Sequence, residues 1–463
     1  MPGNNTHIYT RSIPVDGDYD LVVAGGGPGG VGAALSAARL GARVLLLEAT
    51  GCLGGMGTSA LVAAWSDTAD GERMLAGGIA AELLEEMHAR GCFKPGIHPD
   101  RWRRDLHGGV AFNPEGLKIV LDDYCAKAGV EVRFFTRLID VDHDNKKLNG
   151  VVVNNIEGNK YVRARTFVDG TGDAVLANLC GVACREAGRD TPWIMAPTLC
   201  ALQSGIDTEK FDAGKQQDAV FKAIADGFFT QNDRHVPGLF VNGRDTAIMN
   251  AGHIFNTNAL NCRSLSQAMA TGRKFAREYA EFFRKYLPGC ENMQLIATGS
   301  LLGVRESRRI VGEYELNYED FSARREFPDQ IAIYNKSVDV HVHDCSDEQW
   351  ERYTNEFLRM DRPAKGEYYG LPYGILVPAG GWENLWVAGR CNSSDIKVHG
   401  AIRDQPACIM MGEAAGAAAV QSLKTGQPAC DLDTETLVGT LRAQHCVLPQ
   451  KSLSRQMTRS ARA

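Results

Sequence analysis

The sequence has no long apolar run and no excess of charge of one sign. No stretch reaches the roughly eighteen apolar residues of a membrane span, and the polar residues 1–17 lack the apolar core of a signal peptide. The net charge is −6 and charged residues are scattered along the chain, which indicates no basic surface for a nucleic acid. We therefore expect a cytoplasmic protein that binds neither membranes nor nucleic acids.

Cysteine pairs at metal-binding or redox spacing are also missing. The 13 cysteines are dispersed, odd in number and without a CxxC pair, which favours neither a disulfide framework nor a zinc site. We expect most of them to be reduced, buried, small apolar residues. At 463 residues the chain is too long for one ordinary compact domain and predicts two or three.

A glycine-rich turn is the most informative feature that is present. Gly25, Gly27 and Gly30 follow an apolar run at residues 19–24 and open an alanine-rich segment at residues 31–40. In a dinucleotide-binding turn, one glycine makes the tight turn, one lets the backbone approach a pyrophosphate, and one allows close helix–strand packing. The phosphates then lie at a helix N-terminus, where N–H groups are free. The spacing predicts a bound dinucleotide.

An acidic residue at the expected distance supports this interpretation. A second apolar run, residues 42–47, ends in Glu48, about twenty residues after the turn, where an acidic side chain holds a ribose. No second GxGxxG follows a strand. An enzyme that uses both a flavin and a nicotinamide would often carry two such turns, so a single dinucleotide is the simplest expectation.

The remaining periodicity predicts an α/β fold in several parts. Strands are expected at residues 130–135, 150–154, 161–168, 330–342 and 384–390, and helices at residues 211–229, 264–286 and 404–423. This order predicts a Rossmann-like domain with a parallel sheet and a β-meander, and an inserted α+β substrate domain. The expected boundaries are 18–195 and 366–430 for the cofactor domain, 196–365 for the inserted domain, and 431–463 for a frayed tail.

Four further blocks of sequence have the character of flavin-binding segments. A Gly-Gly pair follows Glu48 within residues 48–58, residues 168–173 read VDGTGD, residues 303–310 read GVRESRRI, and residues 385–416 contain AGRC and GEAAG. Together with the glycine turn, these blocks resemble the FAD-dependent oxidoreductase family of the two-dinucleotide-binding-domain flavoproteins. The resemblance runs from about residue 19 to residue 423 and implies an enzyme with FAD as its cofactor.

The resemblance also implies which residues contact FAD. The pyrophosphate would lie against Gly25, Gly27, Pro28, Gly29 and Gly30, the ribose against Glu48, and the adenine against the backbone of Leu138. Contacts toward the ribitol and flavin would come from Gly54, Gly55, Met56, Thr58, Gly389 and Arg390, and Ala49 and Gly172 are further expected cofactor contacts. One departure is Gly389-Arg390, where many flavoproteins of the wider group have Gly-Asp. The contact of that acid must be made otherwise, and Arg390 could reach a phosphate.

The helix expected at residues 404–423 is the second element assigned to the cofactor. Asp404 can cap it, and Pro406 suits its first turn, where a missing N–H costs nothing. If its N-terminus points at the flavin, its dipole favours the negative charge that reduction places there. Arg403 could add to this effect or could instead pair with a carboxylate, and both interpretations stay open.

Candidate catalytic residues are histidines together with Arg403. Hydride transfer from a C–H bond to a flavin needs orientation, plus a base if an O–H or N–H must lose its proton. His399 and His253 lead, because their segments should meet at the domain boundary, and a structural, hydrogen-bonded histidine is the alternative for each. His341 and His343, two apart on an expected strand, should face one side.

Three other groups of residues admit a functional and a structural interpretation. The run of His341, His343, Asp344 and Cys345 contains metal-binding side chains, but an exposed strand end explains it as well, and we assign no metal. Arg305, Glu306, Arg308 and Arg309 could anchor an anionic substrate or form an ion-pair network. Cys52 and Cys391 could be redox-active or carry a covalent flavin link, or could simply be buried thiols.

The leading functional hypothesis is an FAD-dependent oxidoreductase that acts on a small molecule. It would oxidise a C–H bond of a small hydroxylated or amino compound, or reduce an activated double bond, by hydride exchange with the flavin. One alternative is a flavin-binding electron-transfer or sensor subunit. Another is a thiazole-synthase-like enzyme that uses a dinucleotide, although such proteins lack the long middle domain. The sequence specifies neither the electron acceptor nor the oligomeric state.

Overall fold

A mixed seven-stranded sheet forms the centre of the computed structural model, which describes residues 7, 9–191, 193–357 and 360–449. Its parallel part has the order β5 (Glu131–Arg133), β2 (Val44–Leu47), β1 (Val15–Ala24), β8 (Gly158–Asp169) and β17 (Leu385–Val387). β2 and the second half of β1 are almost wholly buried, as expected for parallel strands with both faces covered.

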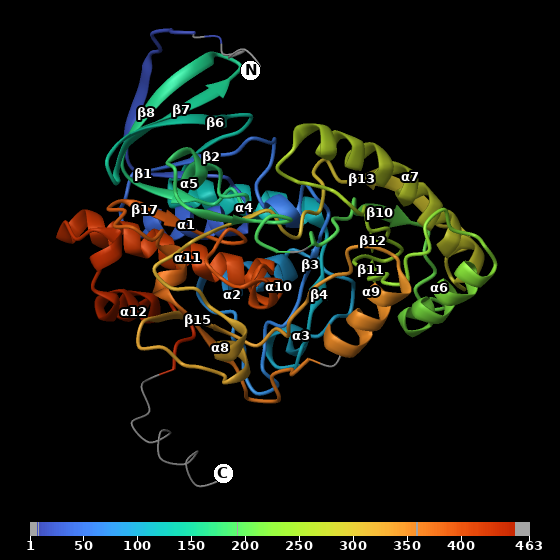
Figure 1. Cartoon of the computed structure of the whole chain (residues 1–463). Helices are drawn as coiled ribbons and strands as arrows, with labels where there is room; N and C mark the ends of the chain where they lie inside the picture. Colours follow the sequence, from blue (N-terminus) through green and yellow to red (C-terminus); the bar gives the residue numbers. More distant parts are fainter. Residues whose placement is uncertain (1–6, 8, 192, 358–359, 450–463) are drawn as a thin grey trace.

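A β-meander extends from the same sheet. β6 (Arg137–Asp144) and β7 (Lys147–Asn155) run antiparallel to each other, and β7 pairs with the first half of β8. Figure 1 shows the meander projecting away from the helices. The predicted α/β fold with a Rossmann-like parallel sheet and a β-meander is thereby confirmed.

Two helices cross closely against the parallel strands. α1 (Pro28–Arg39) follows the glycine turn, and α11 (Gln405–Thr425) packs along it. A Cβ added to Gly412 would lie 2.0 Å from the carbonyl oxygen of Gly29, so only glycine permits this approach. The surrounding core is completed by α2 (Gly78–Ala89), α4 (Pro114–Ala128) and α12 (Thr434–Ala443).

A smaller unit with its own hydrophobic core lies to one side. Its antiparallel sheet has the order β11 (Gly238–Val241), β12 (Ala247–Asn250), β10 (Ala201–Ser204) and β13 (Gln294–Thr298). The long helix α7 (Cys262–Tyr286) and the shorter α6 (Gln216–Ala225) accompany it, as Figure 1 shows in green and yellow. These elements fall inside the predicted inserted domain, whose boundaries stay a prediction.

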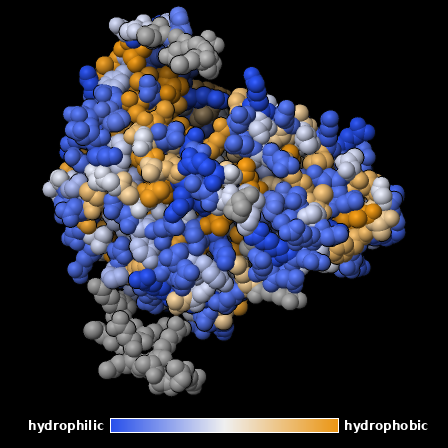
Figure 2. Space-filling view, in the orientation of Figure 1, coloured by the Kyte–Doolittle hydropathy of each residue, from blue (hydrophilic) through white to orange (hydrophobic). Residues whose placement is uncertain are grey.

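The remaining helices and strands are short. They are β3 (Ala64–Trp65), α3 (Asp100–Arg103), β4 (Val110–Ala111), α5 (Val175–Leu179), β9 (Cys184–Glu186), β14 (Arg308–Ile310), α8 (Tyr318–Ser322), β15 (Gln330–Tyr334), α9 (Asp347–Arg352), β16 (Tyr369–Pro372) and α10 (Ile396–Ile402). Among the described residues, no helix is both long and apolar enough to cross a bilayer. The face in Figure 2 is mainly hydrophilic, with an apolar area over the meander.

Three predicted elements differ in the structure. The helix expected over residues 211–229 is only α6, because a 3-10 turn at Ala213–Lys215 precedes it. The strand expected over residues 330–342 ends at Tyr334, so His341 is not on a strand. The tail predicted to be frayed forms α12, which buries Leu437 and Leu441, while residues 450–463 lie outside the described residues.

Glu413 of α11 is buried against the N-terminus of α2. Its Oε2 accepts a hydrogen bond of 2.9 Å from the backbone N–H of Ile79, and burial raises the pKa of the Glu413 carboxyl from 4.5 to about 7. The folded state therefore binds a proton that the unfolded state releases between these two pH values. Stability from this proton is full below the lower value and is lost as the pH rises through about 7.

We expect Glu413→Gln to remove this loss, because the neutral amide keeps an acceptor for Ile79. Each pKa unit corresponds to about 1.4 kcal/mol, so the variant should exceed the wild type by up to about 3 kcal/mol near pH 8 and match it near pH 4. Urea unfolding at both pH values measures this difference, with the exposed Glu435→Gln as control. An equal loss of stability at both pH values would contradict the prediction.

Candidate functional site

A cavity of about 520 Å³ opens at the carboxyl ends of the parallel strands, between the glycine turn and the N-terminus of α11. Of the residues predicted to contact a cofactor, the following line it: Gly25, Gly27, Pro28, Gly29, Glu48, Ala49, Gly55, Met56, Leu138, Gly172, Gly389 and Arg390. Arg403, Gln405 and Cys408 line its other end. Gly30, Gly54 and Thr58 are not among the lining residues, and their predicted contacts stay predictions.

The walls of the cavity approach each other too closely for side chains. Gly25 has φ of +93°, and a Cβ on it would lie 2.7 Å from the carbonyl oxygen of Gly170 across the turn. A Cβ on Gly29 would lie equally close, at 2.7 Å, to the carbonyl oxygen of Ala388. Three chain segments distant in sequence therefore present bare backbone to one space, which suits the close approach of a pyrophosphate.

Two helices begin at this cavity without a side-chain cap. The N-cap residue of α1 is Gly27, and that of α11 is Asp404, whose carboxylate makes no capping hydrogen bond. The predicted capping by Asp404 is therefore wrong, because Asp404 instead accepts from Ser66 at 3.0 Å and pairs with Lys336 at 3.1 Å. Free N–H groups at two helix N-termini attract anionic groups, and the site fits a dinucleotide.

Two acidic side chains are fixed at the cavity wall. Glu48 accepts backbone hydrogen bonds from Gly26 at 2.8 Å and from Thr50 at 2.7 Å, which holds its carboxylate beside the glycine turn. Asp173, which the sequence reasoning did not single out, forms an ion pair with Arg390. Arg390 stands where many flavoproteins of the wider group have an acid, and Asp173 places a carboxylate beside it from the segment after β8. Asp173 is the last residue of the VDGTGD block, so this block could have indicated it.

A charged hollow adjoins the Arg403 end of the cavity. Asp339 Oδ2 accepts from Arg403 at 3.0 Å, and Lys336 bridges Asp67 at 3.2 Å and Asp404 at 3.1 Å. The side chains of Asp339 and Asp404 are 36% and 22% accessible, so solvent reaches this group of charges, which we call the charged hollow. Burial opposes the charge of Lys336, but the two carboxylates raise its pKa, so it remains a cation.

His399 lies near this hollow but not in the cavity lining. It is fully buried in α10, its Nε2 contacts the carbonyl oxygen of Arg305 at 3.1 Å, and its Nδ1 has no hydrogen-bond partner among the described residues. Burial, together with Arg309 and Arg403, lowers the pKa of His399 well below its ordinary value, so the imidazole is neutral. The predicted catalytic role of His399 stays a prediction.

His253 belongs to a buried chain of hydrogen-bonding groups that reaches the hollow. Its Nδ1 lies 2.8 Å from Asp233 Oδ2, and its Nε2 lies 2.9 Å from His341 Nδ1. The Nε2 of His341 lies 3.3 Å from Asp339 Oδ1, and Asp339 contacts Arg403. The structure therefore connects two of the predicted catalytic residues, His253 and Arg403, through a second histidine and a carboxylate.

His235 is the third histidine of this cluster. Candidate donor atoms of His235, His253 and His341 lie within 4.8 Å of one another. However, the His235 ring stacks on His341, with centroids 4.5 Å apart and an interplanar angle of 18°. The lone pair of an imidazole nitrogen lies in the plane of its ring. In two stacked rings the lone pairs therefore lie in parallel planes and do not converge on one ion. His343, Asp344 and Cys345, which the sequence allowed as ligands, join no such group among the described residues.

The GVRESRRI segment contributes one buried cation that hydrogen-bonds to neutral groups. Arg305 donates to the Ala196 carbonyl at 2.6 Å, to Thr198 Oγ1 at 3.0 Å and to Asn250 Oδ1 at 3.3 Å. Burial lowers the pKa of its guanidinium to about 10. Arg308 instead pairs with Glu186, as an ion-pair network would. Arg305 thus keeps a positive charge that an anionic group could use.

The cysteines beside the cofactor cavity show no sign of redox pairing. All 13 cysteines are free. Burial raises the pKa of the Cys391 thiol well above its ordinary value, which keeps it protonated, whereas a reactive cysteine needs its thiolate. Cys52 is half-buried and contacts Ser59 Oγ at 3.1 Å. The structural interpretation of both residues is therefore the simpler one.

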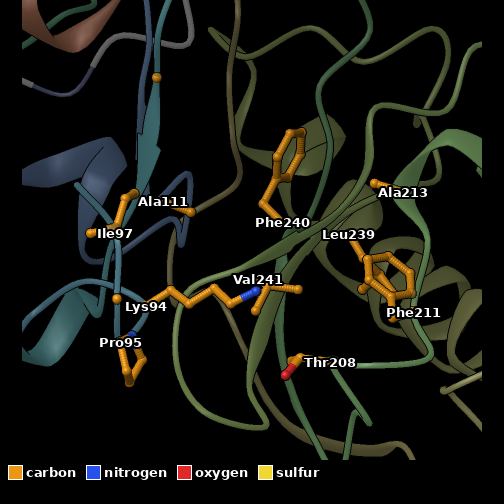
Figure 3. Close-up of a pocket in the computed structure, with 12 residues that line it drawn as sticks. Lys94, Pro95, Ile97, Ala111, Thr208, Phe211, Ala213, Leu239, Phe240 and Val241 are labelled. Atoms are coloured by element: carbon orange, nitrogen blue, oxygen red, sulfur yellow. The ribbon is translucent and has the colours of Figure 1, made fainter. Parts of the chain in front are cut away.

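A second, larger cavity of about 610 Å³ lies between residues 94–111 and the inserted unit. Figure 3 shows Phe211, Leu239 and Phe240 on one side and Ile97 and Ala111 on the other. Among the described residues that line it, Lys94 is the only ionisable one. A single lysine gives this cavity no pair of acid and base, so the candidate site remains at the glycine turn.

Several functional candidates were missed because their signal depends on contacts between distant segments. Asp233, His235, Asp67 and Lys336 stand in unremarkable sequence, and only the fold brings them together. Asp339 had a local signal. It precedes His341 by two residues, and Val338, Val340 and Val342 alternate with them as buried side chains, although the segment forms no strand.

Two curated proteins match a short segment of this chain. Dihydrolipoyl dehydrogenase from Trypanosoma brucei brucei is 48% identical over 48 residues, 10% of this chain and 10% of that protein. The mitochondrial enzyme of the same name from Schizosaccharomyces pombe is 46% identical over 48 residues, 10% of this chain and 9% of that protein. The chain thus matches about a tenth of the length of these curated relatives.

The chain is also similar to solved structures at low sequence identity. The p-nitrophenol 4-monooxygenase from Pseudomonas putida covers 93% of this chain and 89% of its own, with 13% identity and a TM-score of 0.49. A geranylgeranyl bacteriochlorophyll reductase-like protein from Thermoplasma acidophilum covers 92% and 82%, with 14% identity and a TM-score of 0.45. At these identities and TM-scores, the reaction of neither protein is assigned to this chain.

The family itself is established by a match over nearly the whole chain. The model of the FAD dependent oxidoreductase family matches residues 20–441, which includes every block that pointed to a flavin. The resemblance inferred from the sequence, the enzyme class and the cofactor are thereby confirmed. The chain belongs to the FAD dependent oxidoreductase family, and its cofactor is FAD.

Proposed function

We propose that the protein oxidises a small polar substrate that carries a hydroxyl or amino group, with hydride transfer from the adjacent carbon to N5 of FAD. The observation that carries this proposal is the contact between Arg403, which lines the cofactor cavity, and Asp339, a carboxylate that faces the charged hollow. When bound, FAD supplies the acceptor for the electron pair. The step that the protein's own residues must perform is the removal of a proton from the hydroxyl or amino group of the substrate.

Asp339 is the group that we propose accepts that proton. Burial alone would raise its pKa, but the positive charges of Arg403 and Lys336 help to lower the pKa of Asp339 well below its ordinary value. The carboxylate is therefore ionised and carries lone pairs toward the hollow. A substrate O–H or protonated amine that enters the hollow can donate to it, which orients the adjacent C–H and removes the proton as the hydride leaves.

Arg403 and the start of α11 supply positive potential at the same place. Arg403 donates to both the carboxylate and the carbonyl oxygen of Asp339, at 3.0 and 3.2 Å, which holds its guanidinium at the cavity wall. The uncapped N-terminus of α11 adds the positive end of a helix dipole. Both stabilise negative charge on the reduced cofactor, and both favour the binding of oxygen-rich substrates.

Anaerobic mixing with a panel of sugars, polyols, hydroxy acids and amines tests the proposal. We expect at least one hydroxylated or amino compound to bleach the visible flavin absorbance and to yield the corresponding carbonyl or imine. If the flavin is reduced only by a chemical reductant or by NADH or NADPH, the proposed direction of the reaction is wrong. Reduction by the chemical reductant alone would favour an electron-transfer subunit.

A further inference from the structure

The chain from Asp233 to Asp339 contains three places where a proton can sit. They are the contacts from Asp233 to His253 at 2.8 Å, from His253 to His341 at 2.9 Å, and from His341 to Asp339 at 3.3 Å. Each contact joins two nitrogen or oxygen atoms that are acceptors unless one of them carries a proton. Three protons are therefore needed to make all three hydrogen bonds.

Two neutral imidazoles and two carboxylates bring only two protons. One contact is then left with two facing lone pairs, which is unfavourable in a buried site. The contact between His341 and Asp339 is the longest of the three, at 3.3 Å, whereas the two contacts of His253 have ordinary hydrogen-bond lengths. The proton-deficient contact is therefore the one beside the charged hollow.

We propose that the paired imidazoles of His253 and His341 take up the proton that the substrate loses, with Asp339 as the group that first contacts it. This inference rests on the proposed function and extends it by naming where the proton goes. His341 is then a relay and His253 the inner acceptor. Asp233 is a positioning residue, because it fixes the His253 ring through Nδ1 and supplies negative charge to an imidazolium.

The proton balance closes without a further reactant. The substrate O–H bond breaks, its proton binds Asp339, and the electron pair of the C–H bond leaves with the hydride to FAD as the C=O bond forms. The proton then occupies the contact between Asp339 and His341. Transfer to His341 Nε2 releases the Nδ1 proton of His341 to His253 Nε2. All three contacts are then hydrogen bonds, and the histidine pair carries one positive charge.

The groups around the pair fit this role. Charged and titratable side chains around the pair and its two carboxylates are Asp233, His235, Tyr279, Arg305, Lys336, Asp339, Tyr353 and Arg403. Burial and Arg305 lower the pKa of His341 well below its ordinary value, so it is neutral before turnover and can accept a proton. Burial also lowers the pKa of His235 to about 3, so the stacked His235 adds no charge.

Nuclear magnetic resonance of the holoprotein with ¹⁵N-labelled histidine tests the proton count without turnover. We expect the ¹⁵N shifts of the pair to show two protonated and two unprotonated ring nitrogens, as two neutral imidazoles require. A ¹⁵N–¹⁵N coupling through the hydrogen bond should connect the rings. The coupling should vanish in His341→Gln and persist in His343→Gln, a matched control two residues away. Absence of the coupling, or a stoichiometric divalent metal bound by the wild type, would overturn the proposal.

The pH dependence of flavin reduction tests whether the pair serves the reaction. We expect the rate of flavin reduction to fall at low pH, where the pair is already protonated. Asp233→Asn should move this fall in rate to lower pH by about 1–3 pH units, because an imidazolium loses its counter-charge. If neither Asp233→Asn nor His341→Gln changed the pH at which the rate falls, the relay would be contradicted and the proposed function would remain intact. If no polar compound reduces the flavin, the proposed function fails, and the coupling still reports the shared proton.

Discussion

Asp339→Asn is expected to slow reduction of the flavin by the substrate by about 10²- to 10⁴-fold, the usual contribution of a general base. The amide keeps the size of the side chain and still accepts from Arg403, which now donates to the carboxylate at 3.0 Å. It has lost the charge and the basic oxygen that take the proton. Stopped-flow measurement of the loss of flavin absorbance under anaerobic conditions gives the rate.

The control for this variant is Asp344→Asn, five residues away. Asp344 is more exposed, and its ion pair is with His343, outside the histidine chain. We expect Asp344→Asn to reduce its flavin at the wild-type rate, and both variants to retain a full complement of FAD. An Asp339→Asn protein that holds FAD and is reduced as fast as the wild type would show that Asp339 is not the base.

Gly25→Ala is expected to abolish stable FAD binding. Alanine would need φ of +93°, a conformation that L side chains rarely adopt, and its Cβ would lie 2.7 Å from the Gly170 oxygen and 2.8 Å from Thr171 Cα. Since both contacts are to backbone, the segment after β8 must shift, and it forms the opposite wall of the cavity. We expect at least about 100-fold weaker binding, a loss of about 3 kcal/mol.

Release of flavin on denaturation of the purified protein measures this effect, and circular dichroism reports whether the fold survives. Gly439→Ala is the matched control, because a Cβ on Gly439 in α12 meets no atom within 4 Å and the residue has no positive φ. Retention of stoichiometric FAD by a folded Gly25→Ala protein would show that the close approach of these segments is not required for the cofactor.

The cofactor half of the site could be predicted from sequence because its signals are local. Gly25, Gly27 and Glu48 stand at fixed spacings that backbone geometry and the length of a βαβ unit impose. The same physics places Gly389 and the start of α11 at the opposite wall, and Gly25, Gly27, Glu48, Gly389 and Gln405 all line the cavity. The cap failed because Asp404 gains more from a buried cation, Lys336, than from an N–H group.

The catalytic half could be predicted only in part, because it depends on contacts across the fold. Sequence reasoning chose His253 and Arg403 separately, and nothing local indicates that Asp233, 20 residues before His253, accepts from its ring. His341 was placed on a strand that ends at Tyr334, although its alternation with valines was real. Burial and charge pairing, which decide the protonation of these groups, are properties of the packed structure.

The rate of anaerobic flavin reduction by a substrate deuterated at the reacting carbon tests the proposed chemistry most directly. The compound is the member of the panel that bleaches the flavin fastest. We predict slower bleaching with deuterium than with hydrogen in the wild type, because the C–H bond breaks in the step that reduces the flavin. Equal rates for the two isotopic forms, or reduction by nicotinamide nucleotides alone, would contradict hydride transfer from a polar substrate.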